Sequence, residues 1–352
     1  MVKSFLFATA AVSMLISASP CAMATPMSFG YTGTTVTYTV LTTGIYDVVA
    51  YGAQGTGYSK EFTGGRGAEM GGDFLFNVGD VLTIRVGGQG STPSHTGFVW
   101  DGGGGGGGGT FVVGASSAPL VIAGGGGGGG FHNPGASGVA TMQGGSGAGP
   151  GGTRGSGAPA GDFSAGGGGG FVSSGGDNYN PAVTGGGGGS YSSGGRGGIA
   201  GGSIGPDGSS TAGSGGFGGG GGGGDGSDRG GGGGGGGGYS GGGGGGIVFS
   251  YPSNSPTFFA AGGGGSVFNG LLDDAYAIDR VALSGVNAGT GLVTLSLVQD
   301  LTPVQPPTIN PTPLVSEVPE PASVMLLAAG LFGLAPFGRG RKQSLVKRST
   351  TV

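Results

Sequence analysis

Two serines of this chain occur in the pattern G-x-S-x-G, which is the sequence of the nucleophile elbow in serine hydrolases. Ser203 lies in GGSIG and Ser240 lies in GYSGG. The elbow needs a strand before the serine, a helix after it and a histidine later in the chain to act as general base. Both histidines, His95 and His132, precede the serines, and no helix-forming stretch follows either serine. Because polyglycine matches such patterns by chance, we interpret both occurrences as accidental.

Other groups that do chemistry are equally sparse. No lysine lies between Lys60 and Lys342, so the body has no phosphate-binding loop of the G-x-x-x-x-G-K-[ST] type. Two histidines and a single cysteine do not make an ordinary zinc site. Asp225 and Asp228 in GGGGDGSD match part of a glycine-rich calcium repeat, but such repeats work by stacking and the chain has one copy. We therefore expect no enzyme activity, no cofactor and no metal site.

Three further candidates for binding have simpler interpretations. The pair Asp273-Asp274 is more typical of a solvated loop than of a ligand set. Arg196 in GGRGG matches RNA-binding boxes, but an acidic exported chain argues against such a partner. Trp100 and Tyr51 would suit stacking against a carbohydrate, and core packing is the simpler expectation for both.

The segments that would have to position any such group are dominated by glycine. Gly accounts for 101 of the 352 residues, whereas average usage is about 7%. The glycines occur in blocks without a Gly-X-Y period, which excludes collagen. Each interior Gly costs a helix about 1 kcal/mol relative to Ala, which excludes a helical bundle or a coiled coil. A mean hydropathy of +0.14 and a net charge of −4 do not fit a chain that is disordered by charge.

The first 24 residues have the composition of a secretory signal peptide. Lys3 supplies the positive start, residues 5–16 supply the apolar segment, and Ala22 and Ala24 frame the small-residue cleavage site. The apolar segment is shorter than the ~20 residues that span a bilayer. Cleavage after Ala24 by signal peptidase would remove Cys21 and leave an exported chain without disulfides. Lipidation of Cys21 is the alternative, and the proline directly before this cysteine disfavours it.

The C-terminal region has three parts in a fixed order. Residues 301–318 form a proline-rich spacer, of which residues 301–316 favour extended polyproline II and reach roughly 50 Å at ~3.1 Å per residue. After it come Pro319, Glu320 and Pro321, the apolar segment 322–337, and a basic cluster of Arg339, Arg341 and Lys342. As a helix the apolar segment would be about 24 Å long, shorter than a hydrocarbon core of ~30 Å. A permanent single-pass anchor, oriented by the positive-inside rule, is the alternative to a processed signal.

This order of Pro-Glu-Pro, short apolar segment and basic cluster resembles the PEP-CTERM sorting signal of Gram-negative bacteria. The resemblance implies that residues 319–352 are recognised by an exosortase, an integral-membrane transpeptidase-like protease, which cleaves near Pro319–Pro321. The apolar segment would then enter the inner membrane only transiently, as the tails of other tripartite C-terminal signals do. The implied location is the cell envelope, outer surface or extracellular matrix.

Removal of both ends leaves a distinctly acidic body. Six of the 13 Lys and Arg residues lie in the two end segments, so that seven basic residues stand against 17 acidic ones, when Glu320 at the cleavage site is counted with the body. A net charge of about −10 offers no electrostatic footprint for nucleic acid, and we expect no nucleic-acid partner.

Residues 25–300 form the body, in which strand signals occur near both ends. Residues 77–80 read as a hairpin connection, with Gly79 available for a positive φ. After it, Leu82 and Ile84 face one side of the strand and Arg85 faces the other. No window outside the two end segments has helical periodicity, so we predict an all-β fold, a β-sandwich, with helices confined to the terminal targeting segments. The expected strands are 34–41, 45–51, 74–78, 81–86, 111–113, 120–123 and 292–298.

Uninterrupted glycine runs separate these strands. Ordering a Gly backbone costs roughly 1–2 kcal/mol and brings no apolar side chain to offset the cost, so the runs either bond to one another or stay disordered. The ordered solution is the polyglycine II helix, an extended threefold helix whose N–H groups bond laterally to its neighbours. Single aromatic residues between the runs favour the ordered alternative, because a flexible linker has no need of them. They are Phe131, Phe163, Phe171, Tyr179, Tyr191, Phe217, Tyr239 and Phe249.

The body also resembles a receptor domain. The segments VAYGAQG (49–55), GGRGAEMGG (64–72), GDVLTIRVGGQG (79–90) and LVIAGGGGGGG (120–130) are similar to the glycine-rich domain of receptors such as anaplastic lymphoma kinase. The resemblance spans roughly residues 29–298. It implies a tumour-necrosis-factor-like β-sandwich with polyglycine II helices inserted between its strands. In the receptors this domain binds a polypeptide ligand and is braced by disulfides, which this chain lacks.

Taken together, these features indicate a non-catalytic exported structural protein of the cell surface or extracellular matrix, associated with exopolysaccharide or biofilm. The alternative is an extracellular binding module for a polypeptide or polysaccharide.

Overall fold

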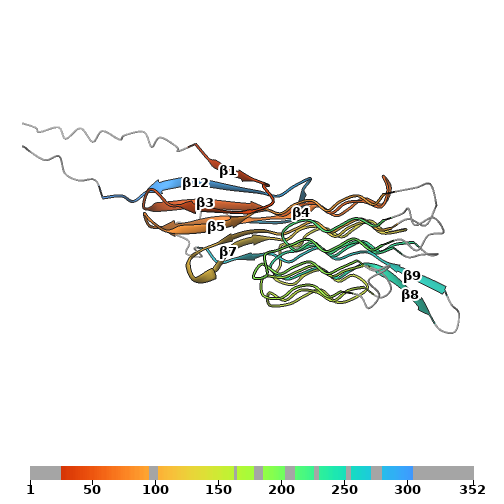
Figure 1. Ribbon diagram of the computed structural model, residues 1–352. Helices are drawn as coiled ribbons and strands as arrows, with labels where there is room; N and C mark the ends of the chain where they lie inside the picture. Colours follow the sequence, from red (N-terminus) through yellow and green to blue (C-terminus); the bar gives the residue numbers. More distant parts are fainter. Residues whose placement is uncertain are drawn as a thin grey trace, which may run out of the picture. The chain divides into compact units, whose positions relative to one another are not determined.

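The structure is a computed structural model of the chain and describes residues 25–94, 102–161, 165–177, 185–202, 211–225, 230–250, 255–270 and 280–303 (Figure 1). The chain divides into a compact unit that ends at Pro303 and a second unit that begins at Val304. Both predicted terminal helices, in segments 1–24 and 322–337, lie outside the described residues. Within the described ranges, no helix has the length and apolar character needed to cross a bilayer.

Two five-stranded antiparallel sheets pack together as a sandwich-like pair of layers (Figure 1). In sheet 1 the strand order is β1 (Met27–Gly30), β12 (Leu292–Asp300), β3 (Gly44–Tyr51), β4 (Gly67–Phe76) and β11 (Val281–Asn287). In sheet 2 it is β10 (Val267–Phe268), β7 (Pro119–Ala123), β6 (Thr110–Val113), β5 (Val81–Arg85) and β2 (Thr35–Thr39). A separate hairpin pairs β8 (Gly246–Ser250) with β9 (Ser255–Phe259), and a short 3-10 helix, η1 (Ala115–Ser117), connects β6 to β7.

The core lies between the two sheets and follows from the alternation of side chains along each strand. In β3, Tyr46 and Val48 point inward and are buried, whereas Asp47 between them is on the outer face. Leu82 and Ile84 of β5 enter the same core from sheet 2, as the alternation predicts. The other large members of the core are Met70, Phe74, Phe76, Val112, Val121, Val293 and Leu295.

All seven expected strands are present, but the hairpin expected at 77–80 is wrong, because these residues form a turn that carries the chain from β4 in sheet 1 to β5 in sheet 2. The backbone N–H of Asp80 donates to the carbonyl of Asn77 at 3.0 Å, and Gly79 has a φ of +92°. The strands β1, β8, β9, β10 and β11 and the first part of β4 were not expected. The first part of β4 has three glycines and no β-branched residue, and β11 contains a glycine, so both strands are specified by their neighbours instead.

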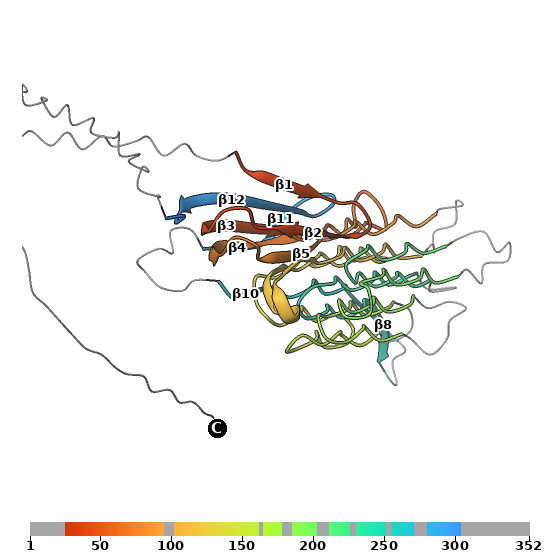
Figure 2. The ribbon, with the colours of Figure 1, turned by 60° about the vertical axis from the view of Figure 1, so that its left-hand side comes forward.

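The glycine runs continue the strands of the sandwich beyond its edge (Figure 2). Run 102–109 leads directly into β6 and run 124–130 leaves directly from β7. The two runs remain neighbours, as β6 and β7 are, because Gly107 and Gly104 donate to carbonyls of the run that follows β7. We call the hydrogen-bonded set of glycine-rich segments the glycine block.

Hydrogen bonds inside the glycine block repeat with a period of three residues. In run 102–109, every third N–H group donates to the same neighbouring segment, and the two groups between them donate to two other segments. The bonds to the first neighbour run from Gly103 to Gly224, Gly106 to Gly221 and Gly109 to Gly218. Those to the second run from Gly104 to Gly129 and Gly107 to Gly126, and those to the third from Gly105 to Ser91 and Gly108 to Gly88. Each segment therefore bonds in three directions, whereas a sheet strand bonds in two.

The two layers of the sandwich come into direct contact where glycine begins. Sheets that pack face to face lie about 10 Å apart, because side chains fill the space between them. Beyond β3 this spacing is gone: the N–H of Ala53 donates to the carbonyl of Gly108 at 2.9 Å, and Gly126 donates to Ala53 at 2.9 Å. Every glycine of runs 102–109 and 124–130 is buried. The interior of the glycine block is thus made of paired backbone groups, which satisfies the requirement that buried N–H and C=O groups be bonded.

Candidate functional site

The residues predicted to carry sorting and processing lie outside the described residues. They are Ala22 and Ala24 at the signal-peptide cleavage site, and Pro319, Glu320, Pro321, Arg339, Arg341 and Lys342 in the C-terminal signal. The same holds for His95, Trp100, Ser203, Asp228, Asp273 and Asp274.

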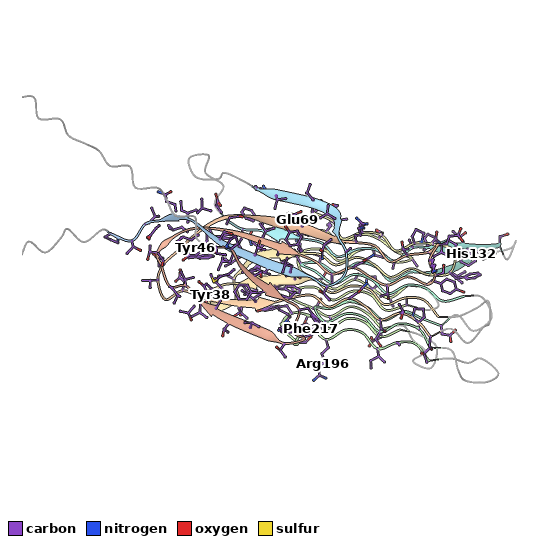
Figure 3. All side chains as sticks on the ribbon, turned by 90° about the horizontal axis from the view of Figure 1, so that it is seen from above. Tyr38, Tyr46, Glu69, His132, Arg196 and Phe217 are labelled. Atoms are coloured by element: carbon purple, nitrogen blue, oxygen red, sulfur yellow. The ribbon has the colours of Figure 1, made fainter. Side chains whose placement is uncertain are left out.

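The remaining candidates for chemistry have structural surroundings. Ser240 is fully buried in the glycine block, where its hydroxyl accepts a hydrogen bond from the N–H of Gly155 at 3.1 Å. His132 lies at the far end of the glycine block and contacts aromatic rings (Figure 3). In the part of the chain that the structure describes, no three His, Cys, Asp or Glu side chains are arranged to hold a metal ion.

Tyr51 lies half-buried on the outer face of sheet 1 and is not a member of the core between the sheets. Its hydroxyl donates to Glu69 Oε1 at 3.0 Å, from the neighbouring strand β4 (Figure 3 labels Glu69). Burial, together with this hydrogen bond, raises the pKa of Tyr51 to about 12.

This raised pKa predicts a loss of stability at high pH. Above pH 10, the ordinary pKa of tyrosine, the unfolded chain releases the phenol proton while the folded chain keeps it, so the contribution of Tyr51 falls between pH 10 and about 12. Unfolding in urea over this range should show a decline that is smaller in Tyr51→Phe. Glu69→Gln should lower the pKa of Tyr51, which absorbance titration of the phenol measures. An unchanged pKa would contradict the assigned hydrogen bond.

The outer face of sheet 2 is covered by aromatic corners of the glycine block. Phe111, Ile122 and Val267 on this face form a second hydrophobic cluster. The rings of Tyr191 and Phe171 stack on each other at 4.9 Å, and Tyr191 contacts Phe111 at 5.2 Å. At these positions, aromatic residues that lie between glycine runs therefore pack against the β-sheet.

Arg85 ties the same corner to β5. Its side chain is 7% exposed, with Nη1 donating to the carbonyl of Tyr191 at 2.9 Å and Nε donating to Thr35 Oγ1 at 3.2 Å. The guanidinium also lies over the rings of Tyr191 and Phe217, at 4.3 and 5.6 Å. Burial lowers the pKa of Arg85. The sequence placed Arg85 on the face away from the core but contained no signal for what would cover it.

A second aromatic group, which we call the distal aromatic cluster, lies around His132 (Figure 3). The ring of His132 lies 4.9 Å from that of Phe258 and 5.9 Å from that of Phe62. Two of its members come from the connection between β3 and β4, two are adjacent residues that follow run 124–130, and Phe258 comes from the β8–β9 hairpin. The cluster consists of Tyr58, Phe62, Phe131, His132 and Phe258, all of them partly or fully exposed.

Comparison with known proteins identifies the C-terminal signal. No curated protein matches the sequence of this chain. Residues 317–342 match the family described as the PEP-CTERM protein-sorting motif. The match begins just before the predicted signal and ends at the last residue of the predicted basic cluster. The predicted resemblance of the C-terminus is therefore confirmed, and the chain is an exported protein with a β-sheet body that carries a PEP-CTERM sorting motif for processing by an exosortase.

Proposed function

We propose that this protein is a non-catalytic structural component of the cell surface or extracellular matrix of a Gram-negative bacterium. Signal peptidase would cleave it after Ala24 during export, and the exosortase would remove its C-terminal signal near Pro319–Pro321. The observation that carries this proposal is the joining of a sorting motif, residues 317–342, to a body built on backbone hydrogen bonds. Such a body has few reactive side chains and suits a building material.

We further propose that the segments of the glycine block are polyglycine II helices. The period of three in their hydrogen bonds supports this assignment, because a threefold helix directs successive N–H groups to three neighbours in turn. The likeness to the receptor glycine-rich domain, with its tumour-necrosis-factor-like sandwich, belongs to the same proposal.

Exopolysaccharide or biofilm matrix is the proposed surrounding of the processed protein. The alternative, a module that binds a polypeptide or polysaccharide, has a specific surface in its favour. The distal aromatic cluster gathers partly exposed rings at one end of the body, and aromatic side chains are enriched where proteins bind partners. A saturable ligand of the body would be sought there.

Deletion of residues 319–352 tests the sorting claim. Without the apolar segment and the basic cluster, the exosortase has nothing to retain or recognise, so we expect the protein to lose surface display and to escape as a soluble export product. Fractionation and surface labelling of cells measure the outcome. A matched control deletes only residues 343–352, which lie beyond the matched motif, and should be displayed normally. Unchanged display of the larger deletion would contradict the sorting role.

A further inference from the structure

Both ends of the described body leave from the same end of the sandwich (Figures 1 and 2). Strand β12 ends at Asp300, which pairs with Gly44 at the end of sheet 1 away from the glycine block. Strand β1 runs antiparallel to β12, so the chain before Met27 also enters from this side. The glycine block lies at the opposite end. The segments before and after the described body are therefore joined covalently to this end of the sandwich.

Exposed apolar side chains gather at this end. Leu41 is 75% exposed and Val78 is 64% exposed, and they lie in adjacent loops, because the N–H of Gly79 donates to the carbonyl of Val40 at 2.8 Å. Thr43 connects the remaining loop: its hydroxyl accepts a hydrogen bond from the N–H of Val78 and its carbonyl accepts one from Leu301. We call this group the apolar tip; it consists of Leu41, Leu75, Val78, Val81 and Leu301.

An apolar pocket of about 190 Å³ opens beside the apolar tip and shares Val81 with it. Phe76, Leu82 and Leu120 form its apolar wall. The pocket extends the apolar surface inward from the tip.

The charges near the apolar tip are acidic. Asp80 accepts a hydrogen bond from the N–H of Asn77, and Asp300 accepts one from the N–H of Thr302. No lysine or arginine occurs in segments 39–45, 75–82 or 298–303. A surface of this kind attracts an apolar partner without favouring anionic groups.

We propose that the apolar tip is a membrane-docking surface that contacts the bilayer while segment 322–337 is inserted. The apolar tip is the face that docks because residues 304–321 join it covalently to the apolar segment. This connection spans at most roughly 60 Å. This tether holds the tip at a high effective concentration near the bilayer. The inference rests on the proposed insertion of the C-terminal signal. In the docked state the glycine block and the distal aromatic cluster point away from the membrane.

The test compares two label positions in residues 25–352, the chain left by the proposed cleavage after Ala24, which has no cysteine of its own. One protein carries Val78→Cys at the apolar tip and the other carries Ile199→Cys in the glycine block, where the side chain is 78% exposed. Each is labelled with an environment-sensitive fluorophore and mixed with phosphatidylcholine–phosphatidylethanolamine vesicles containing brominated lipid. We expect quenching at position 78 to be at least about fivefold greater than at position 199. Co-sedimentation with the vesicles reports separately whether segment 322–337 inserts.

Each outcome decides the matter. Co-sedimentation with equal or absent quenching at both positions overturns docking and leaves the sorting proposal intact, whereas failure to co-sediment overturns docking and the insertion of segment 322–337 on which it rests. Adding Leu41→Ser and Val81→Ser to the position 78 protein should lower the ratio of docked to undocked molecules about tenfold, because apolar burial is lost. Met142→Ser and Val172→Ser, at exposed positions of the glycine block, should change nothing. Adding anionic phosphatidylglycerol to the vesicles should weaken quenching at position 78, because the charges near the apolar tip are acidic. Stronger quenching would contradict an apolar contact.

Discussion

Replacing Gly234 by alanine should lower the free energy of unfolding by at least about 3 kcal/mol. Gly234 is buried in the glycine block, where its N–H donates to Gly104 and its carbonyl accepts from Gly128 at 2.7 Å. An added Cβ would collide with the carbonyl of Gly221. Overpacking usually costs ~1–3 kcal/mol. Here the obstacle is hydrogen-bonded backbone that cannot rotate away as a side chain does, so the cost should lie at or above the upper end of that range.

Gly30→Ala is the matched control for this prediction. No atom lies within 4 Å of a Cβ added at Gly30, and its φ is not positive. Alanine there should leave stability unchanged or raise it by up to ~1 kcal/mol through the unfolded chain. Urea unfolding measures both variants, and hydrogen exchange should report faster exchange at the amides of Gly104 and Gly128 in Gly234→Ala only. Equal stability of the two variants would show that the glycine runs are not packed as described.

Arg85→Ala should cost about 3 kcal/mol, the second large effect. The substitution removes one of the two hydrogen bonds to the carbonyl of Tyr191, the other coming from the N–H of Gly194, and takes the guanidinium away from the rings of Tyr191 and Phe217. A hydrogen bond to a charged group contributes ~1.5–3 kcal/mol and a desolvated cation–π contact up to ~2 kcal/mol. The relief from burying a charge offsets part of this sum. Urea unfolding, followed by near-ultraviolet circular dichroism of the stacked tyrosine, measures the loss.

Arg196→Ala controls for loss of a positive charge in the same part of the chain. Arg196 is exposed (Figure 3), and its removal should change stability by less than ~0.5 kcal/mol. Arg85→Lys retains the charge but not the planar fork that bonds Thr35 and Tyr191 together, and should recover less than half of the loss. Full recovery by lysine would mean that charge alone holds the corner of the glycine block.

The strands that sequence reasoning predicted are those whose own residues carry the signal. β3 and β5 are rich in β-branched and aromatic residues that alternate between the core and the outer face of the sheet, and both form as expected. β11 was missed because its sequence, VALSGVN, contains a glycine and lies at the edge of sheet 1, where pairing with β4 specifies it. Likewise Arg85 was assigned correctly to the outer face, but its partner Tyr191 is more than a hundred residues away in sequence.

The amino-acid sequence alone was enough to identify the C-terminal sorting motif, the all-β class and the need for glycine to satisfy its own backbone. Each of these depends on local order or composition. The tertiary structure established which glycine lies against which, because every run has the same composition and no side chain distinguishes one neighbour from another. The sandwich supplies the distinction: its strands enter the glycine block in a set order, and Gly107 and Gly126 become neighbours because β6 and β7 already are. In the glycine block, where no side chains separate the two layers, the layers lie at hydrogen-bonding distance, and paired backbone groups replace side chains as the core.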